Sequence, residues 1–290
     1  MALPFGKNAL SEKIRPIYAG DQEDFHWVGF GSGSGTNLRE CAKVIKPTLI
    51  FSDKPHAKLF SLEELAQERG IIHLSIDGYD YCGSWKQAQS SPKLQEEYRK
   101  RSEEFNYQIV EFLHEAEKLQ RAPFDLIVLG GYMRLVGEPL LRAYPDKIIN
   151  VHPADLSLLT QKFERKYVGE DAVYDAIKAG EERTKSSVIM VDGGIDHGEI
   201  LTQGPLVDVR EDFLRMGEAE QKYCLREVAD AHQSKQKEKS DWPALTLALK
   251  LIAEGRIALG TEKSFLNEWR KVYVDGKAAH YNGVGVIEVK

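Results

Sequence analysis

The chain has 290 residues, 42% of them hydrophobic, with a formal net charge of −6 at pH 7 and an isoelectric point near 5.8. This length suits one sizeable α/β domain with a closed core and leaves little room for a second full domain. The acidic balance supplies no basic field, so a protein that binds long nucleic acids by neutralising their phosphates is disfavoured.

Targeting and membrane signals are absent from the sequence. No apolar run approaches the length of a membrane span, and the first residues, MALPFGKNALSEKIRP, lack the unbroken apolar core of a signal peptide. We therefore expect a cytoplasmic protein with no membrane partner. Cys41, Cys82 and Cys224 show neither a CxxC pair nor metal-ligand spacing, which predicts free thiols.

Short apolar runs alternate with longer amphipathic ones along the chain. The strand candidates are FHWVGF, PTLIF, IIHLSI, FDLIVLG, KIINV, SSVIMV and ILTQGPLV. Helices are expected at residues 37–44, 92–119 and 244–254, and the charged stretch 211–241 is also strongly helical in composition. This alternation predicts a Rossmann-like α/β fold, with a mainly parallel sheet flanked by helices.

The domain prediction follows from these elements. We place an N-terminal extension over residues 1–25, the main domain over 26–260 and a C-terminal tail over 261–290. Within the tail, the steps Asp275-Gly276 and Asn282-Gly283 indicate turns between short strands that would pack on the domain.

A glycine-rich turn, GSGSGTN, follows the first predicted strand and leads into a helix near Asn37. Backbone N–H groups in such a loop can approach an anion, and the helix N-terminus adds its partial positive charge. The spacing G-x-G-x-x-G fails, because its last position is Ser34, Thr36 or Leu38, depending on the first glycine. No Lys-Ser or Lys-Thr follows, so the Walker pattern fails as well. A nonstandard phosphate loop and a structural tight turn remain.

Asp53, just after the second predicted strand, bears on a competing interpretation. A carboxylate there could hold a ribose, as in a nicotinamide-dependent oxidoreductase, and an exposed turn aspartate explains it equally well. The failed glycine spacing argues against the oxidoreductase.

Three polar residues suggest acid–base chemistry. Asn150 and His152 lie two apart at the carboxyl end of a predicted strand, where open α/β sheets bind their ligands. Asn150 can donate to an oxyanion, and His152 can carry a proton near neutral pH. Asp196 lies in the glycine-rich loop DGGIDHGEIL, where it is either a turn residue or a carboxylate that orients the imidazole.

These segments together resemble the folate-dependent formyltransferases, and most closely the members that formylate glycinamide ribonucleotide. The resemblance spans roughly residues 28–259, in the order GSGSGTNL, IFSDKPHA, LGGYMRLV, INVHP and VDGGIDHGEIL. The specific part is Asn-x-His-Pro joined to the later Asp-x-Gly-x-Ile. The resemblance implies formyl transfer from 10-formyltetrahydrofolate to the amine of glycinamide ribonucleotide in purine biosynthesis.

The resemblance also implies a role for each matching position. The catalytic set is Asn150, His152 and Asp196. Residues on the acceptor side are Gly33, Gly35, Thr36 and Asn37 for the phosphate, Lys235 beside the phosphate and Glu238 on the ribose. Residues that line the folate pocket are Met133, Arg134, Leu135, Val136, Val191, Asp192, Gly193 and Ile195. The partners would be small molecules, no metal would be required, and a homodimer is compatible with the family.

The expected mechanism begins with attack of the acceptor amine on the formyl carbon. Asn150 and a protonated His152 would donate to the resulting oxyanion, while Asp196 holds the imidazolium and helps to move the proton.

One departure from the family's pattern leaves the acceptor open. The segment PADLSLLTQKFERKYVG after His152 is several residues longer than usual, so an amino-sugar nucleotide is an alternative acceptor. A methionyl-tRNA formyltransferase would need a further C-terminal domain and a basic face, and a formyl-folate hydrolase would need an additional domain. A non-catalytic folate-binding module is the remaining alternative.

Overall fold

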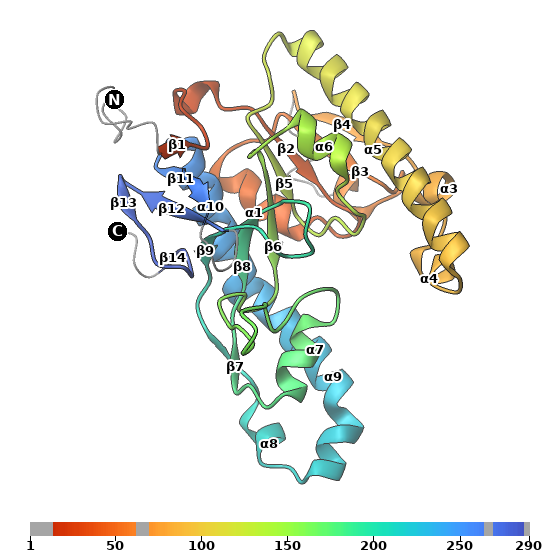
Figure 1. Cartoon of the computed structure of the whole chain (residues 1–290), viewed down its shortest axis with the longest axis vertical. Coiled ribbons are helices and arrows are strands. Elements are labelled where there is room, and N and C mark those ends of the chain that lie inside the picture. The colour runs from red at the N-terminus through yellow and green to blue at the C-terminus, as the bar shows by residue number, and fades with distance from the viewer. Residues whose placement is uncertain (1–13, 62–69, 264–268, 287–290) are drawn as a thin grey trace. The chain divides into compact units, whose positions relative to one another are not determined.

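The computed structural model describes residues 14–61, 70–263 and 269–286 (Figure 1). By its internal contacts the chain forms two compact units. The N-terminal unit comprises Asp24–Ile149 with Val191–Gly193, and the C-terminal unit comprises Asn150–Met190 and Gly194–Lys290 with the residues before Asp24. Each unit is described in turn.

Parallel strands form the centre of the N-terminal unit, in the order β4-β3-β2-β5. Their bounds are β2 (Trp27–Phe30), β3 (Leu49–Ser52), β4 (Ile72–Ser75) and β5 (Leu126–Leu129). Every residue of β2, β3 and β5 is buried, whereas β4 is largely exposed. Strands covered on both faces give continuous apolar runs in the sequence, which is why these runs predicted them well.

The helices of this unit are α1 (Thr36–Val44), α3 (Gly78–Cys82), α4 (Trp85–Ala88), α5 (Pro92–Gln120) and α6 (Glu138–Ala143), with a 3-10 turn at Lys58–Ser61. Another 3-10 turn, Gln22–Asp24, ends at the first residue of this unit. The long helix α5 begins where Ser91 Oγ accepts from Leu94 N at 3.3 Å. Its apolar stripe, which includes Phe105, Ile109 and Leu113, packs in one core with side chains of the strands. The spacing of this stripe predicted the helix to within one residue at its end.

β6 (Ile148–His152) carries the chain from one unit to the other. In the C-terminal unit, β8 (Ser187–Met190) pairs antiparallel with β9 (Ile200–Gln203), which pairs parallel with β14 (Val284–Gly285). β7 (Arg183–Thr184) and β10 (Val207–Asp208) form an antiparallel ribbon. Each strand expected from the sequence is present, and the α/β fold with a mainly parallel sheet and flanking helices is confirmed.

A second sheet of the C-terminal unit is antiparallel, in the order β1-β11-β12-β13. Its strands are β1 (Ile14–Pro16), β11 (Ile257–Lys263), β12 (Arg270–Val274) and β13 (Lys277–Ala278). The chain turns between β12 and β13 at Asp275 and Gly276, which have φ values of 50° and 76°. Both values are positive, as a tight hairpin turn requires.

The helices of this unit are α7 (Ala172–Lys178), α8 (Glu211–Leu214), α9 (Glu218–Gln236), a π-helical turn at Lys237–Asp241 and α10 (Trp242–Ala253). α10 packs on β8 and β9, and α9 packs against α7. The charged stretch 211–241 is therefore helical, as expected. Its buried side includes polar residues, which made its periodicity hard to recognise.

A buried polar cluster lies under the end of α9. His232 and Gln236 are 5% and 0% exposed, and His232 Nε2 lies 2.7 Å from Thr184 Oγ1. The Thr184 hydroxyl donates to Gln236 Oε1, so His232 Nε2 must be the donor to Thr184. Burial, with help from the charge of Lys235, lowers the pKa of His232 to about 4, and Asp208 opposes the shift. The imidazole is therefore neutral at pH 7.

This depressed pKa predicts a pH-dependent stability. Between pH 6.5 and 4 the unfolded chain binds a proton at residue 232 that the native state does not, so the free energy of unfolding falls as the pH falls. One proton corresponds to a slope of about 1.4 kcal/mol per pH unit. His232→Gln, which keeps a donor toward Thr184, should reduce the slope by about that amount in urea unfolding from pH 7 to 4. An unchanged slope would contradict the assignment.

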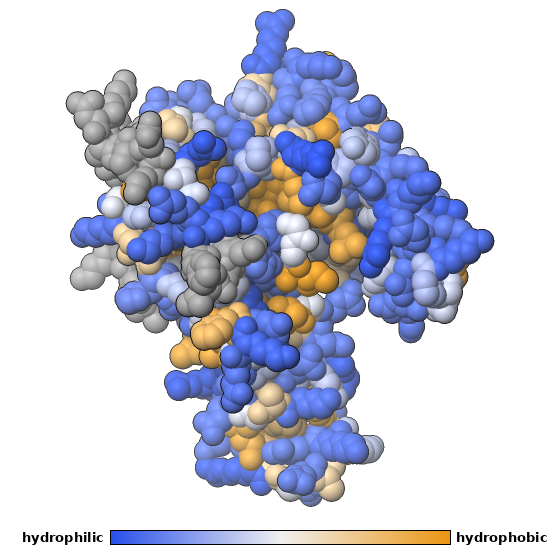
Figure 2. Space-filling model, in the orientation of Figure 1, coloured by the Kyte–Doolittle hydropathy of each residue, from blue (hydrophilic) through white to orange (hydrophobic). Residues whose placement is uncertain are grey.

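The visible surface is mostly hydrophilic, with hydrophobic residues in separate patches (Figure 2). One patch lies over α8 and the beginning of α9, where Met216, Ala219, Tyr223 and Cys224 line a shallow pocket. None of the described helices is long and apolar enough to span a membrane. The three cysteines carry free thiols, as expected.

Candidate active site

His152 is the last residue of β6 and is 4% exposed. Its Nε2 lies 3.0 Å from the carbonyl oxygen of Tyr167. Because a carbonyl oxygen can only accept, Nε2 carries a hydrogen and donates it. Nδ1 is therefore the ring nitrogen that can gain or lose a proton. Asn150, two residues earlier on β6, is partly exposed and shares the C-terminal unit with His152.

The loop between β8 and β9 brings Asp196 to this imidazole. Asp196 Oδ2 lies 3.4 Å from His152 Nδ1, and the carboxylate is only 12% exposed. The same oxygen accepts a hydrogen bond from Gly169 N at 2.8 Å. Asp196 has a φ of 48°, which residues other than glycine rarely adopt. The structure thus joins two of the three predicted catalytic residues.

The electrostatics of the pair suit proton transfer. Burial lowers the pKa of His152, whereas Asp196 and the Tyr167 carbonyl raise it, and Arg165 lowers it further. The net shift is downward, so the ring is neutral at pH 7 and turns the Nδ1 lone pair toward a carboxylate oxygen. A proton that binds to Nδ1 would lie between this nitrogen and Asp196 Oδ2. The imidazole would then be positively charged and form an ion pair with the carboxylate.

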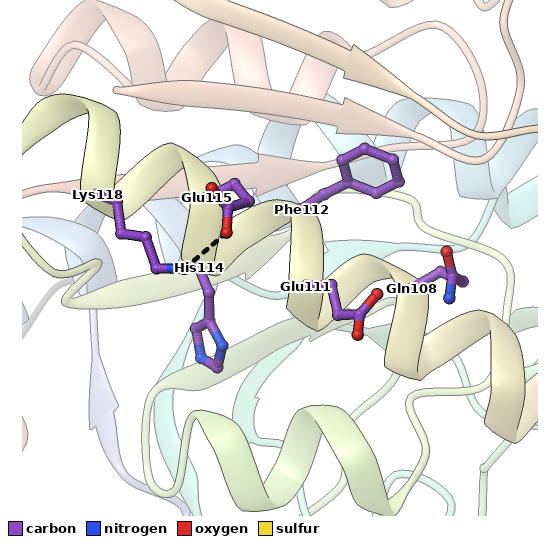
Figure 3. Close-up of a pocket in the computed structure, with 6 residues that line it drawn as sticks. All are labelled: Gln108, Glu111, Phe112, His114, Glu115 and Lys118. Atoms are coloured by element: carbon purple, nitrogen blue, oxygen red, sulfur yellow. Dashed lines mark hydrogen bonds and ion pairs between the residues drawn. The ribbon is translucent and has the colours of Figure 1, made fainter.

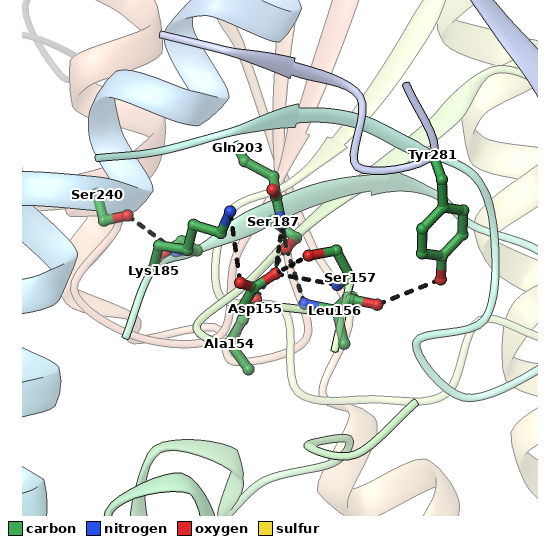
Figure 4. Close-up of polar contacts among 10 residues, drawn as sticks. Ala154, Asp155, Leu156, Ser157, Lys185, Ser187, Gln203, Ser240 and Tyr281 are labelled. Carbon is green, nitrogen blue, oxygen red and sulfur yellow. Dashed lines mark hydrogen bonds and ion pairs between the residues drawn. The ribbon is translucent and has the colours of Figure 1, made fainter. Parts of the chain in front are cut away.

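Hydrogen bonds fix the segment that follows His152 (Figure 4). Asp155 accepts from Gln203 Nε2 at 2.8 Å and lies 3.4 Å from Lys185 Nζ. Ser187 Oγ donates to the carbonyl of Ala154 at 2.8 Å. Further back, Gln236 Nε2 donates to the carbonyl of Pro153 at 2.8 Å. Residues of β8, β9 and α9 therefore hold the chain immediately after His152, which restricts the movement of its imidazole.

The glycine-rich turn lies in the N-terminal unit, at the start of α1. Gly35 is the residue before the helix and has a φ of 67°, and no side chain caps the helix there. The first N–H groups of α1 have no acceptor within the helix. Thr36 Oγ1 is buried, with no hydrogen-bond partner among the described residues. A side chain at Gly33 would meet no atom within 4 Å. This combination suits a bound anion.

Residues 133–136 lie beside this turn in the same unit. Met133 N donates to Ser32 Oγ at 2.9 Å, and the side chains of Met133 and Leu135 are exposed. Arg134 points inward, where its Nε donates to Asp53 Oδ2 at 2.8 Å. Any contact of Arg134 with a ligand would therefore come from its backbone.

Asp53 is 2% exposed, so its interpretation as an exposed turn aspartate is wrong. A ribose-binding role would need an accessible carboxylate, and the structure instead pairs this one with Arg134. The glycine spacing already argued against a nicotinamide-dependent oxidoreductase, and Asp53 no longer supports one.

The other predicted site residues are distributed over both units. Val191, Asp192 and Gly193 belong to the N-terminal unit, with Asp192 partly exposed, and Ile195 is 71% exposed in the C-terminal unit. Lys235 and Glu238 are exposed on α9 and the π-helical turn, where Lys235 Nζ donates to the carbonyl of Asp208 at 3.0 Å.

Two functional candidates escaped the sequence analysis. Arg165 donates to the carbonyl of Asp196, and Gln236 holds the carbonyl of Pro153. Each stands in a charged stretch, KFERK or KQKEK, and no spacing signal distinguishes it from its neighbours.

A pocket of about 470 Å³ on α5 is lined by none of these residues (Figure 3). It is lined by Gln108, Glu111, Phe112, His114, Glu115 and Lys118. Lys118 Nζ pairs with Glu115 Oε1 at 2.6 Å, and no predicted site residue is present. Within residues 14–61, 70–263 and 269–286, no group of three or more His, Cys, Asp or Glu residues could hold a metal ion.

Comparison with known proteins supports the chemistry of this site. Residues 61–217 match the family model described as formyl transferase. The chain belongs to the formyl transferase family. The curated phosphoribosylglycinamide formyltransferase of Bacillus subtilis is 33% identical over 181 residues, which cover 60% of this chain and 75% of that relative.

Solved structures of family members share the fold. A phosphoribosylglycinamide formyltransferase from Coxiella burnetii, in complex with CHES, aligns with a TM-score of 0.56 and 21% identity, covering 90% of this chain and 98% of that one. Glycinamide ribonucleotide transformylase 1 from Symbiobacterium toebii aligns with a TM-score of 0.53 and 24% identity, covering 86% and 93%. The formyltransferase-type fold is thereby confirmed.

The buried pair of Arg134 and Asp53 predicts a large stability effect. Arg134→Met leaves a buried carboxylate without its partner, which should cost about 3–5 kcal/mol in urea unfolding. The double variant Asp53→Asn with Arg134→Met should recover part of this loss. Arg142→Met removes an exposed pair with Glu138 and should cost less than about 1 kcal/mol. A loss for Arg134→Met no larger than this control would show that the pair is not stabilising.

Proposed function

We propose that this formyl transferase moves the formyl group of 10-formyltetrahydrofolate to the amine of glycinamide ribonucleotide, in purine biosynthesis. The observation that carries the proposal is the pairing of His152 Nδ1 with Asp196 Oδ2 at the end of β6. Family membership and the similarity to the phosphoribosylglycinamide formyltransferase of Bacillus subtilis support the choice of substrates.

The reaction begins when the acceptor amine attacks the formyl carbon. A carbon–nitrogen bond forms, and the formyl oxygen becomes the oxyanion of a tetrahedral intermediate. The side-chain amide of Asn150 donates to this oxygen. Loss of one such preorganised donor typically raises the barrier by about 3–4 kcal/mol.

His152 acts in this scheme as the proton relay. The sequence led us to expect a protonated imidazole as a second oxyanion donor. However, Nε2 is already bonded to the Tyr167 carbonyl, and Nδ1 faces Asp196. Nδ1 and Asp196 Oδ2 therefore share the proton that leaves the amine and return it to the folate nitrogen as the carbon–nitrogen bond to folate breaks. The oxyanion collapses to the carbonyl of the new formamide, and tetrahydrofolate leaves with the proton on its nitrogen.

The residues proposed to hold the substrates are those that the family resemblance implies. In the N-terminal unit, Gly33, Gly35, Thr36 and Asn37 would bind the acceptor phosphate through backbone N–H groups and the Thr36 hydroxyl, which finds no hydrogen-bond partner in the described part of the chain. Lys235 and Glu238 of the C-terminal unit would contact the phosphate and ribose. The folate would lie on residues 133–136 and 191–193 and on Ile195.

Each proposed step uses only side-chain and backbone groups of the protein, so we propose that no metal takes part. A cytoplasmic location, the lack of nucleic-acid partners, a homodimer and the domain boundaries at residues 26 and 260 stay predictions.

Kinetic tests of the proposed catalytic set follow directly. Asn150→Ala, His152→Ala and Asp196→Asn should each lower kcat by at least a hundredfold, because each removes a transition-state contact or the proton path. Release of tetrahydrofolate with glycinamide ribonucleotide as the acceptor measures the effect. Near-normal turnover in His152→Ala or Asp196→Asn would refute the assigned roles. Turnover only with an amino-sugar nucleotide would reassign the acceptor.

The phosphate-binding role of the glycine turn has its own test. Gly33→Ala adds a methyl group to open space, so the protein should fold normally while KM for the acceptor rises about tenfold or more. Gly217→Ala, also in open space but at the start of α9, is the matched control and should leave KM unchanged. Equal KM values in the two variants would remove the glycine turn from the acceptor site.

A further inference from the structure

We propose that residues 165–169, locked by Trp269, form the scaffold that positions the His152–Asp196 pair, with Arg165 as its key positioning residue. This inference rests on the proposed function for its kinetic part. Its structural part concerns only the C-terminal unit and can be tested without turnover.

Three contacts from this short segment reach the pair. The carbonyl of Tyr167 accepts from His152 Nε2, and Gly169 N donates to Asp196 Oδ2. Arg165 donates to the carbonyl of Asp196 and, at 2.7 Å, to the carbonyl of Gly198. The segment 165–169 thus fixes the imidazole, the carboxylate and the backbone that carries the carboxylate.

The positively charged side chain of Arg165 is buried, and burial disfavours a charge that lacks compensating contacts. It is 8% exposed, and the structure gives its guanidinium no ion pair among the described residues. The group is stabilised instead by two carbonyl oxygens and by the ring of Trp269, whose centroid lies 4.7 Å from Cζ. Burying a cation without a carboxylate partner lowers the stability of the fold unless other contacts compensate. The two carbonyl groups and the Trp269 ring are these contacts, and they tie Arg165 to the loop that carries Asp196.

That consequence is the backbone geometry of the Asp196 loop. Asp196 has a positive φ, which is unfavourable for a residue with a side chain. On its far side, a side chain at Gly198 would lie 1.9 Å from the carbonyl of Met190, so the chain there is already tightly constrained. Because Arg165 binds the carbonyls of both residues, it holds the strained loop in the one conformation that directs Oδ2 to Nδ1.

Trp269 connects the C-terminal segment to the same loop. Its Nε1 donates to the carbonyl of His197, the residue between the two carbonyls that Arg165 binds. Its ring packs on Tyr281, with 4.9 Å between centroids, and Tyr281 Oη donates to the carbonyl of Leu156 at 3.3 Å. The described part of the tail is therefore a support for the candidate catalytic loop.

The kinetic test is a double-mutant cycle. Arg165→Lys keeps the charge but replaces the planar fork, whose two nitrogens bind two separate carbonyls, with a single nitrogen on a flexible stem. This variant should lower kcat at least tenfold while both KM values change less than threefold. Adding Arg165→Lys to Asp196→Asn should cause no further loss, because its effect passes through the carboxylate. Additive losses would mean that Arg165 is only structural and would overturn the inference. Trp269→Phe, which keeps a ring face, should retain more activity than Trp269→Ala.

A spectroscopic test separates this inference from the proposed function. In ¹H–¹⁵N spectra, the amide of Gly169 reports its hydrogen bond to Asp196 Oδ2. Arg165→Lys and Trp269→Ala should move this signal in the direction that Asp196→Ala moves it, while Arg226→Lys, an exposed pair with Asp171, should not. An unmoved Gly169 signal in Arg165→Lys overturns the scaffold. If Asp196→Asn turns over normally, the proposed catalytic role fails, and the Gly169 signal still decides the positioning claim.

Discussion

The hydrogen bond from His152 Nε2 to the carbonyl of Tyr167 determines how the candidate site can work. It fixes which ring nitrogen carries the permanent hydrogen, and it therefore directs the exchangeable position to Nδ1 and Asp196. Without this bond the imidazole could rotate and present either nitrogen to the reacting atoms. Burial then keeps the ring neutral until a proton is offered, which is the state that a relay needs.

The fold was predictable where burial is complete. β2, β3 and β5 are covered on both faces, so their apolar runs are unbroken, and α5 has a stripe at helical spacing. The C-terminal unit was harder to derive from the sequence. α9 turns His232 and Gln236 inward, and polar residues at core positions hide the periodicity that marks a buried helix face. The antiparallel sheet that includes β1 and β11 depends on partners distant in the sequence, which no local pattern reveals.

For the candidate site, too, some features could be predicted from the sequence and others could not. The spacing of Asn150 and His152 on one strand, with a carboxylate in a later glycine-rich loop, was enough to suggest the chemistry, and the structure joins His152 to Asp196. The same information could not assign the ring nitrogens or find Arg165, because both depend on contacts with carbonyl groups. Backbone acceptors are the same at every residue, so a sequence carries no mark of which carbonyl a side chain will bind. Asp53 was misread for a related reason, since its partner, Arg134, is distant in the sequence.

The lengthened segment after His152 is held by hydrogen bonds at both ends, whereas its middle is exposed. Its length can therefore vary without disturbing the His152–Asp196 pair. At its start, Gln236, Ser187 and Gln203 hold the chain, and at its end residues 165–169 contact His152 and Asp196. Between them the chain makes a local hairpin, in which Leu159 pairs with Arg165 and residues 161–164 are exposed. Added residues there cost little, since closing a slightly longer exposed loop has a small entropic penalty. The pairing of Leu159 with Arg165 at the base of this hairpin also fixes the backbone from which Arg165 reaches the Asp196 loop. A departure from the family's pattern is thus compatible with the family's chemistry.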